Sequence, residues 1–193
     1  AAQAAAAGID LAAERAVTSD RLNRLRAGVL GANDGIVSTA ALILGVAGAS
    51  LSHDALLTAG VAGLVSGALS MAVGEYVSVS AQRDSEKAAV LTERTTLAEF
   101  PEAELEELIT LLQARGLRAE TARAAARELT HHDALAAHAN IELGIELGRY
   151  TDPLHAALAS ALSFALGALV PLAVVLLSPL AVAVPVMVAA ILV

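Results

Sequence analysis

The sequence predicts an all-α fold: a multi-pass helical membrane protein with an inserted, charged helical domain. The 193 residues are 56% hydrophobic and only 17% charged, whereas soluble domains carry about 25% charged residues. The charged residues are concentrated in a few segments. In addition, no segment alternates polar and apolar residues in the way that is typical of a half-buried strand.

The charge distribution separates long apolar stretches from one charged stretch. Residues 83–149 hold 13 acidic and 8 basic side chains, a local net charge of −5. The apolar stretches contain only two charged residues: Asp34 within 27–53, Glu75 within 55–82, and none within 154–193. The average composition therefore describes neither kind of segment.

The apolar stretches are long enough for membrane helices, since about 20 residues cross roughly 30 Å of hydrocarbon. We expect spans at 28–50, 56–80 and 154–177, and part of a fourth at 180–193 after a break at Ser178-Pro179. The last segment has only 14 residues. We therefore expect the sequence to be incomplete at its C-terminus. The lack of a methionine at Ala1 indicates the same for the N-terminus.

Two pairs of glycines in the first two spans are four residues apart: Gly31 with Gly35, and Gly63 with Gly67. In a bilayer, this spacing lets helix backbones approach closely. The pairs favour close packing in a bundle or a dimer. Because Gly and Ala are abundant here, the spacing alone does not specify it.

The expected organisation has four parts: a leader at 1–26, two spans within 27–82, the charged domain at 83–149, and the remaining spans within 150–193. Basic residues in short flanking segments mark the cytoplasmic side of a membrane protein. Four arginines precede the first span and eight basic residues lie in the charged domain, whereas the loop between the first two spans has none. We therefore expect the leader and the charged domain to be cytoplasmic.

The charged domain is expected to be helical throughout. The helix of the second span continues without a breaker to about residue 98, and further helices are predicted at 102–115, 119–130 and 134–143. Pro101 suits a first helical turn and Asp133 suits an N-cap. Gly116 and Gly144 suit the ends of helices.

Composition and motifs exclude several functions. The chain has no cysteine, so it has no disulfide, thiolate metal site or cysteine nucleophile. Four aromatic residues and a net charge of −8 argue against nucleic-acid binding, which needs stacking platforms and basic surfaces. No Gly-rich phosphate loop, GxSxG elbow or HExxH motif is present. We do not expect an enzyme.

Two carboxylates in the first two spans lie at matching depths. Asp34 follows Arg26 by eight residues and Glu75 precedes Arg83 by eight, which places both roughly 12 Å inside the cytoplasmic edge. Met71 lies one turn deeper than Glu75 on the same helix face. A thioether beside carboxylates favours a transition metal over Mg²⁺ or Ca²⁺, so these three residues are candidates for a metal pathway. Alternatively, each carboxylate lies at the interface or pairs with a leader arginine.

Acidic side chains and one histidine recur at helical spacing in the charged domain. The pairs are Glu86 and Glu93, Glu104 and Glu107, and His138 and Glu142. Each pair can occupy one helix face, and carboxylates with an imidazole are divalent-metal ligands. These six residues are candidates for a metal site, but the spacing alone favours a solvated surface, which is the usual role of charged helix faces. Glu128 and His131 form a single Glu-x-x-His, whereas di-iron bundles use two, so a soluble di-iron enzyme ranks last.

Five segments are more specific than these spacings. They are GANDGIVST (31–39), SGALSMAVGEYVSVSAQRD (66–84), FPEAELEEL (100–108), DALAAHANIELG (133–144) and DPLHAALASALSFALGALVPL (152–172). Together, and in this order, they resemble the vacuolar iron transporter family of plants and fungi with its bacterial relatives. The resemblance covers about residues 21–193.

The resemblance implies a five-span homodimeric transporter that exchanges cytosolic Fe²⁺ or Mn²⁺ for protons. It thereby implies that the fifth span is absent from the given sequence. It assigns Asp34 and Met71 to the pathway and four glutamates to a cytoplasmic metal-binding domain: Glu93, Glu104, Glu107 and Glu142. The chain also departs from the family. Ala27, Gly63 and Thr96 stand where acids are expected, and His138-Ala139 replaces a methionine pair. Since histidine also binds these metals, the site is expected to be altered but retained.

The expected function is therefore export of Fe²⁺ and/or Mn²⁺ from the cytosol by proton antiport, carried out by a homodimer in a lipid bilayer. The alternative is a membrane-anchored iron buffer or sensor that does not transport. One lysine against eleven arginines favours a GC-rich bacterial source, and with it the bacterial cell membrane as the location.

Overall fold

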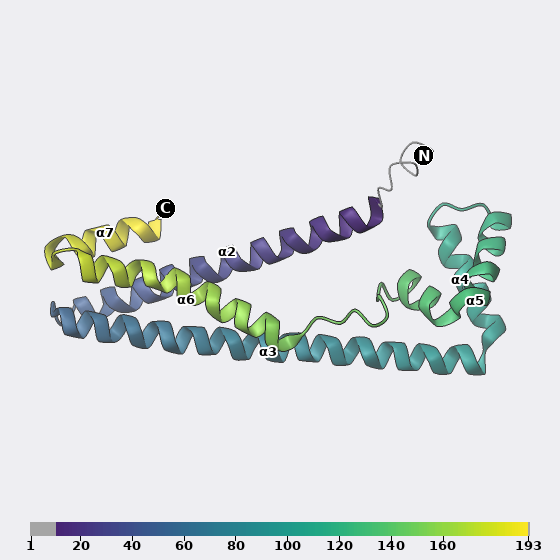
Figure 1. Ribbon diagram of the computed structural model, residues 1–193, viewed down its shortest axis with the longest axis horizontal. Coiled ribbons are helices and arrows are strands. Elements are labelled where there is room, and N and C mark those ends of the chain that lie inside the picture. Colours follow the sequence, from purple (N-terminus) through teal and green to yellow (C-terminus); the bar gives the residue numbers. More distant parts are fainter. Residues whose placement is uncertain (1–10, 193) are drawn as a thin grey trace. The chain divides into compact units, whose positions relative to one another are not determined.

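The computed structural model describes residues 11–192, and all their regular secondary structure is helical. Six helices follow in order (Figure 1): α2 (Leu11–Ala47), α3 (His53–Glu99), α4 (Pro101–Ala114), α5 (Ala119–Ile141), α6 (Pro153–Leu177) and α7 (Leu180–Leu192). The all-α prediction is confirmed. The first ten residues of the predicted leader lie outside the described part of the chain.

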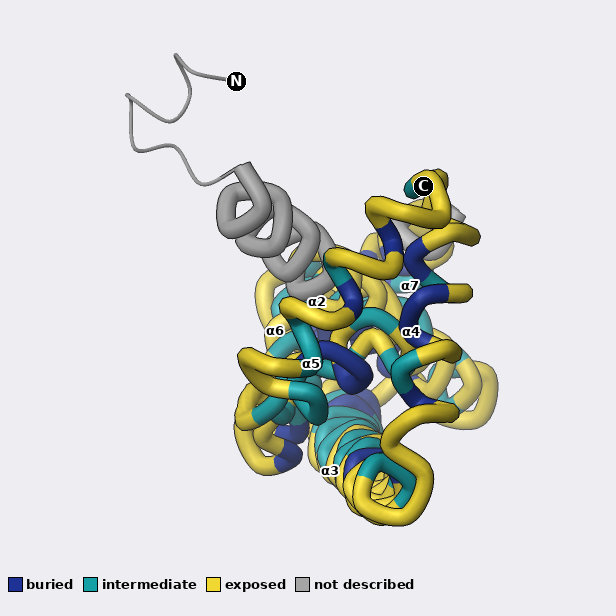
Figure 2. The backbone as a smooth tube through the Cα atoms, turned by 90° about the vertical axis from the view of Figure 1, so that its right-hand side faces the viewer, coloured by how far each residue is buried: buried dark blue, intermediate teal, exposed yellow. Residues whose placement is uncertain are grey.

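Within residues 11–192, three helices are long and apolar enough to cross a membrane, which confirms a helical membrane protein. They are Leu25–Ala47 within α2, α3 and α6, and the most apolar windows of these three helices have mean hydropathies of 1.6, 1.9 and 2.3. Only 11% of the most apolar window of α3 is buried, and the helix is largely yellow in Figure 2. Apolar side chains that remain exposed over such a length suit contact with lipid.

The break predicted at Ser178-Pro179 separates α6 from α7. The backbone N–H groups of Val182 and Ala183 donate to the Pro179 carbonyl at 2.9 and 3.0 Å. The new helix therefore begins directly after the proline, which has no N–H to continue the preceding one. The first span ends at Ala47 and not at the expected residue 50, because the chain turns at 48–49.

The chain divides into two compact units, which are described separately. One unit contains residues 1–76 and 154–193, and the other contains Val77–Pro153. We call them the membrane unit and the charged unit. Helix α3 contributes its first part to the membrane unit and its last part to the charged unit.

The membrane unit is packed through glycines. A Cβ atom on Gly35 of α2 would collide with the backbone of Phe164 in α6, and one on Gly167 of α6 would collide with the backbone of Ala32. Gly67 of α3 leaves room for the Phe164 ring. The close helix packing that the glycine spacing favours is thus present, and α2, α3 and α6 meet around Phe164.

The charged unit is built on the pairing of α4 with α5. Buried side chains from the two helices share one core: Leu108, Ile109 and Leu112 from α4, with Ala122, Ala126 and Ala137 from α5. Small alanines opposite large side chains let the two helices lie close together. Gly116, with a φ of +97°, makes the turn between them in a conformation that favours glycine.

Helix α5 bends at Asp133, where two helices were predicted. Asp133 has non-helical angles (φ −162°, ψ 96°), and its carboxylate accepts a hydrogen bond from the Ala136 N–H at 2.9 Å. The predicted N-cap is therefore confirmed. The second half of α5 ends at Ile141, and Gly144 follows with a φ of +67°.

Candidate functional site

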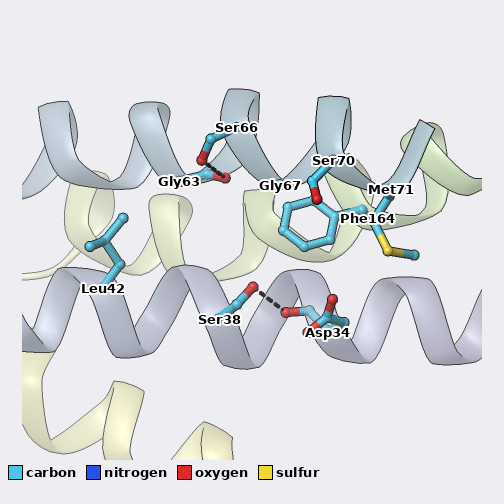
Figure 3. Close-up of a pocket in the computed structure, with 9 residues that line it drawn as sticks. All are labelled: Asp34, Ser38, Leu42, Gly63, Ser66, Gly67, Ser70, Met71 and Phe164. Carbon is cyan, nitrogen blue, oxygen red and sulfur yellow. Dashed lines mark hydrogen bonds between the residues drawn. The ribbon is translucent and has the colours of Figure 1, made fainter. Parts of the chain in front are cut away.

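The membrane unit contains a pocket of about 250 Å³ between α2, α3 and α6. Asp34 and Ser38 line it from α2, and Met71 lines it from α3. Figure 3 shows the Met71 side chain extending from α3 toward α2, on the side where Asp34 lies. The structure thus brings together the carboxylate and the thioether that the sequence singled out as metal ligands.

Three serine hydroxyls also line this pocket, those of Ser38, Ser66 and Ser70. Ser38 donates its proton to the Asp34 backbone carbonyl at 2.5 Å, and Ser66 donates to the Gly63 carbonyl at 3.3 Å (Figure 3). A serine that donates to its own helix keeps its oxygen lone pairs available. The wall of the pocket therefore offers oxygen acceptors beside the carboxylate, which suits a cation.

These serines and Phe164 were not among the residues predicted from the sequence. Ser38 follows Asp34 by one turn, Ser70 directly precedes Met71, and Ser66 precedes Ser70 by one turn. That helical spacing was a usable signal. Phe164 had none, because its position depends on how closely α6 approaches two glycines.

Glu75, the second predicted carboxylate, does not line this pocket. It lies one turn from Met71 on α3 and is exposed in the single chain. Asp34 is also exposed, although it lines the pocket. Of the three residues predicted to form one layer, Asp34 and Met71 therefore line the pocket and Glu75 does not.

The charged unit contains a cluster of three carboxylates and one imidazole, which we call the four-residue cluster: Glu93, Glu104, His138 and Glu142. The cluster draws one residue from α3, one from α4 and two from the end of α5. Each offers a ligand atom, and these atoms lie within 4.8 Å of one another. This spacing is suited to a single metal ion.

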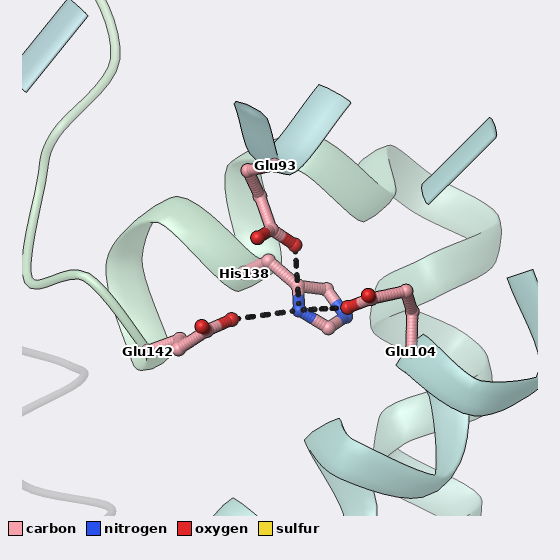
Figure 4. Close-up of side chains that lie close together, drawn as sticks. All are labelled: Glu93, Glu104, His138 and Glu142. Atoms are coloured by element: carbon pink, nitrogen blue, oxygen red, sulfur yellow. Dashed lines mark hydrogen bonds and ion pairs between the residues drawn. The ribbon is translucent and has the colours of Figure 1, made fainter. Parts of the chain in front are cut away.

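His138 lies at the centre of the four-residue cluster (Figure 4). Its Nδ1 is 3.1 Å from Glu93 Oε1, 3.2 Å from Glu142 Oε2 and 3.6 Å from Glu104 Oε2. The side chain is fully buried, and Nε2 has no hydrogen-bond partner among the described residues. The nitrogen that faces the carboxylates is thus Nδ1.

Burial makes the four-residue cluster electrostatically unfavourable when it is empty. Desolvation raises the pKa of Glu93, the negative charges of Glu142, Glu104 and Glu107 raise it further, and His138 lowers it. Glu93 Oε1 is buried and has no well-aligned hydrogen bond, although it lies close to His138 Nδ1. A bound cation would compensate these crowded charges.

Local structure fixes the end of α5 that carries two members of the cluster. His138 and Glu142 are one turn apart, so their side chains share a helix face. The Arg115 guanidinium, at the end of α4, donates to the Ile141 carbonyl next to Glu142. The N–H groups of Glu142 and Leu143 donate to the His138 carbonyl at 2.8 and 3.3 Å. These bonds hold the ligand-bearing turn against α4.

Two of the six predicted ligands lie outside the four-residue cluster. Glu86 accepts a hydrogen bond from the Gln82 amide at 2.9 Å. Glu107 is exposed on α4 and acts on Glu93 only through its charge.

Thr96 stands one turn from Glu93 and donates to the Glu93 backbone carbonyl at 3.0 Å. Its hydroxyl therefore supports the helix and is not one of the four ligands.

Comparison with known proteins identifies the family. The family model described as "VIT family" matches residues 25–193, which contain both the pocket and the four-residue cluster. The chain belongs to the VIT family. The VIT-family segment thus begins where α2 becomes apolar, at Leu25.

Named relatives support this membership. A "Vacuolar iron transporter" of Acanthamoeba castellanii is 49% identical over 78% of this VIT-family chain and 54% of its own length. In Oryza sativa, "Vacuolar iron transporter homolog 2" is 38% identical over 79% of this chain and 58% of its own length. "Vacuolar iron transporter homolog 3" from the same species is 62% identical over 37% of this chain and 28% of its own length. The chain therefore spans about half the length of the longer matches.

Proposed function

We propose that this VIT-family chain moves Fe²⁺ or Mn²⁺ out of the cytosol through its membrane helices. The observation that carries the proposal is the pocket in which Asp34 and Met71 meet between helices of membrane-spanning length. A carboxylate, a thioether and hydroxyl oxygens form a ligand set for a divalent transition metal. The name of the amoebal relative supports iron as the transported ion.

The proposed mechanism has three steps. The acidic charged unit binds metal from the cytoplasm and raises its concentration near the membrane. The ion then binds at Asp34 and Met71, with Glu75 as a further carboxylate one turn away. Protons from the far side compete for these carboxylates and release the ion, because a protonated carboxyl group no longer coordinates metal. Transport would therefore be proton antiport.

A homodimer is part of the proposal, because Asp34 and Glu75 are both exposed in the single chain. A charged side chain facing lipid is unfavourable by about 2.5–3.5 kcal/mol on insertion scales. A second copy covering this side of α2 and α3 would remove both carboxylates from lipid. It would also double the number of ligands along the pathway.

The proposed topology places the N-terminal leader and residues 83–149 in the cytoplasm, since these segments carry the basic residues. The composition favours a bacterial cell membrane. The compared relatives come from an amoeba and from rice, and their names refer to a vacuole. In either membrane the protein would have the same orientation, and metal would leave the cytosol.

Uptake into proteoliposomes tests the proposed function. The purified chain is reconstituted with an acidic lumen, and Fe²⁺, Mn²⁺ and Mg²⁺ entry is followed with a fluorescent indicator. We expect Fe²⁺ or Mn²⁺ entry that is faster than in protein-free vesicles and that stops when the proton gradient is collapsed. Equal rates with and without protein would contradict transport, and rates independent of the gradient would contradict antiport.

The second candidate function is a membrane-anchored iron buffer or sensor, which the buried four-residue cluster favours. In that case the chain binds metal but moves none, and neutralising the cluster abolishes function. Asp34→Asn and Glu75→Gln would then be tolerated. The uptake assay separates the two candidates, because only a transporter fills the vesicle lumen.

A further inference from the structure

The pocket of the membrane unit has a polar end and an apolar end. Asp34, Ser38 and Leu42 line it on successive turns of α2, while Met71 and Gly63 line it from α3. In Figure 3, Leu42 and Gly63 lie at the opposite end of the row from Asp34 and Met71. Leu42 follows Asp34 by eight residues, which places it roughly 12 Å farther along α2. The pocket therefore changes from polar to apolar along its length.

The apolar end is closed by a contact between α2 and α3. Gly63 has no side chain, and a Cβ atom added to it would lie 3.0 Å from Leu42 Cδ2. Leu42 is 43% exposed in the single chain, whereas Ile43 next to it is fully buried. A side chain that is packed on one side only can change rotamer readily. Leu42 is therefore a movable part of the pocket wall.

Beyond this contact the membrane unit is apolar. Residues 40–47 of α2 include no polar side chain. On α3, a Cβ atom added to Gly60 would meet the side chains of Ile43 and Leu172. Ile43 belongs to a buried apolar core with Leu56, Val175, Ala183 and Met187. An ion that moves from Asp34 in this direction thus meets an apolar barrier that begins at Leu42.

A buried hydroxyl lies beside the closing contact. Thr39 is 1% exposed, and its Oγ1 lies 3.8 Å from the Cβ position of Gly63. Among the described residues, this oxygen has no hydrogen-bond partner. A buried hydroxyl without a partner is unfavourable, so water or an ion admitted past Leu42 would relieve it.

We propose that Leu42 is the gate at the non-cytoplasmic end of the pocket. In the structure its side chain lies against Gly63 and closes this end, and rotation of the side chain away from Gly63 opens it. The inference rests on the proposed function, because it supplies the barrier that an antiporter needs. The ion site must not be open to both sides of the membrane at once.

Thiol labelling tests the gate without measuring transport. The chain has no cysteine, so Ser38→Cys places a single thiol in the pocket between Asp34 and Leu42. A thiol reacts as its thiolate, and its reaction with a water-soluble reagent therefore reports access of water to the pocket. A membrane-impermeant cationic methanethiosulfonate is added to right-side-out or inverted vesicles that contain the full chain.

Two exposed positions identify the side of the membrane that each vesicle presents. Ser52→Cys reports the loop before α3, and Ser85→Cys reports the charged unit. Each substitution is made alone in the cysteine-free chain. The side from which the reagent reaches Ser38→Cys is then read by comparison with these two.

We expect Ser38→Cys to react from the Ser85 side only. Adding Leu42→Ala should raise its rate of reaction from the Ser52 side by about tenfold or more, since a small decrease in a barrier has this effect. Two further substitutions are controls. Leu42→Met keeps the volume of the side chain, and Leu69→Ala removes an exposed leucine of α3 that does not line the pocket. Both should leave the labelling one-sided.

Two outcomes would overturn the inference. One is reaction of Ser38→Cys from the Ser52 side while Leu42 is intact. The other is a Leu42→Ala chain that still reacts from the Ser85 side, which shows that it is folded, but stays unreactive from the Ser52 side. Labelling does not require transport. A chain that fails in the uptake assay but labels as expected would refute the proposed function and retain the closure at Leu42.

Discussion

Asp34 and Glu93 are two carboxylates in opposite situations, and the difference defines their expected roles. Asp34 is exposed in the single chain but lies in an apolar helix that has membrane length. Glu93 is nearly buried in a charged unit among other carboxylates. The ionised Asp34 side chain is unfavourable where it faces lipid. The ionised Glu93 side chain is unfavourable because it is buried among other negative charges. A divalent cation relieves both.

Glu93→Gln should stabilise the metal-free chain at neutral pH. Burial raises the pKa of Glu93 in the folded state. The side chain therefore makes its full favourable contribution to the free energy of unfolding at pH values below the ordinary carboxyl pKa. That contribution is lost as the pH rises through the raised pKa. Glutamine removes the ionisation, so the unfolding temperature in EDTA should rise at neutral pH and change little at acidic pH.

The same substitution should weaken metal binding, since it removes a ligand charge. Glu86→Gln, on the same helix but outside the four-residue cluster, is the matched control for both measurements. A Glu93→Gln chain that is less stable than the parent at neutral pH in EDTA would show that ionised Glu93 is not a source of strain.

Met71→Leu tests the thioether in the membrane pocket. Leucine has a similar volume, so the substitution removes the sulfur with little change in packing, at a cost below about 1.5 kcal/mol. A soft ligand favours Fe²⁺ over Mn²⁺. We therefore expect Fe²⁺ uptake to fall severalfold relative to Mn²⁺ uptake.

Met187→Leu is the matched control, because Met187 is buried in a core that α7 shares with α2, α3 and α6 and does not line the pocket. It should leave the ratio of Fe²⁺ to Mn²⁺ uptake unchanged. If both leucine variants give the parent's ratio, the thioether of Met71 does not contribute to ion choice.

At the scale of elements, the glycine contacts decide whether the pocket forms. Gly35 admits the α6 backbone at Phe164 and Ala168, and Gly67 admits the Phe164 ring. Gly67 lines the pocket together with Met71 and Phe164, and Gly35 directly follows Asp34, which also lines it. Small residues thus set the distances between the three helices that carry the ligands.

Gly35→Ala should separate α2 from α6 and impair transport. The added methyl group meets backbone atoms that cannot rotate away, and overpacking of this kind destabilises by about 1–3 kcal/mol. The unfolding temperature in detergent and the uptake rate should both decrease. Gly45→Ala on the same helix, where nothing lies within 4 Å of the added atom, should behave like the parent, and equal effects of the two would refute this role of Gly35.

Helix boundaries were largely predictable because single residues determine them. The break before α7 follows from Pro179, the bend in α5 from Asp133 and the turn after α4 from Gly116. Each acts through its own backbone or a neighbouring N–H, so its effect is local. The early end of the first span at Ala47 was not predicted although Gly48 follows it, because the same helix contains several other glycines and one more is not a distinct stop signal.

The candidate sites were predictable only in part, because spacing along a helix does not determine which helix lies opposite. The pair of His138 and Glu142 is local and was found, and Glu104 joined it through the pairing of α4 with α5. Glu107 has the same chemistry as Glu104 but lies on the exposed side of α4. Phe164 lines the membrane pocket because of glycines on two other helices, a tertiary effect.

At the scale of the whole molecule, each unit carries one candidate metal site with its own chemistry. The membrane unit offers a carboxylate, a thioether and hydroxyl oxygens, and the charged unit offers three carboxylates and an imidazole. We propose that the first site carries out transport and that the second collects metal. Removing the first site should therefore change the kinetics of uptake in a different way from removing the second.

The most direct test measures Fe²⁺ uptake into acidic-lumen proteoliposomes by Asp34→Asn, Glu104→Gln and the parent over a range of Fe²⁺ concentrations. Asp54→Asn, in the first turn of α3 and outside the pocket, is the control. We expect Asp34→Asn to reduce uptake to that of protein-free vesicles at every concentration. Glu104→Gln should slow uptake only at low Fe²⁺, and Asp54→Asn should match the parent. Parent-like uptake by Asp34→Asn at all concentrations would contradict the account.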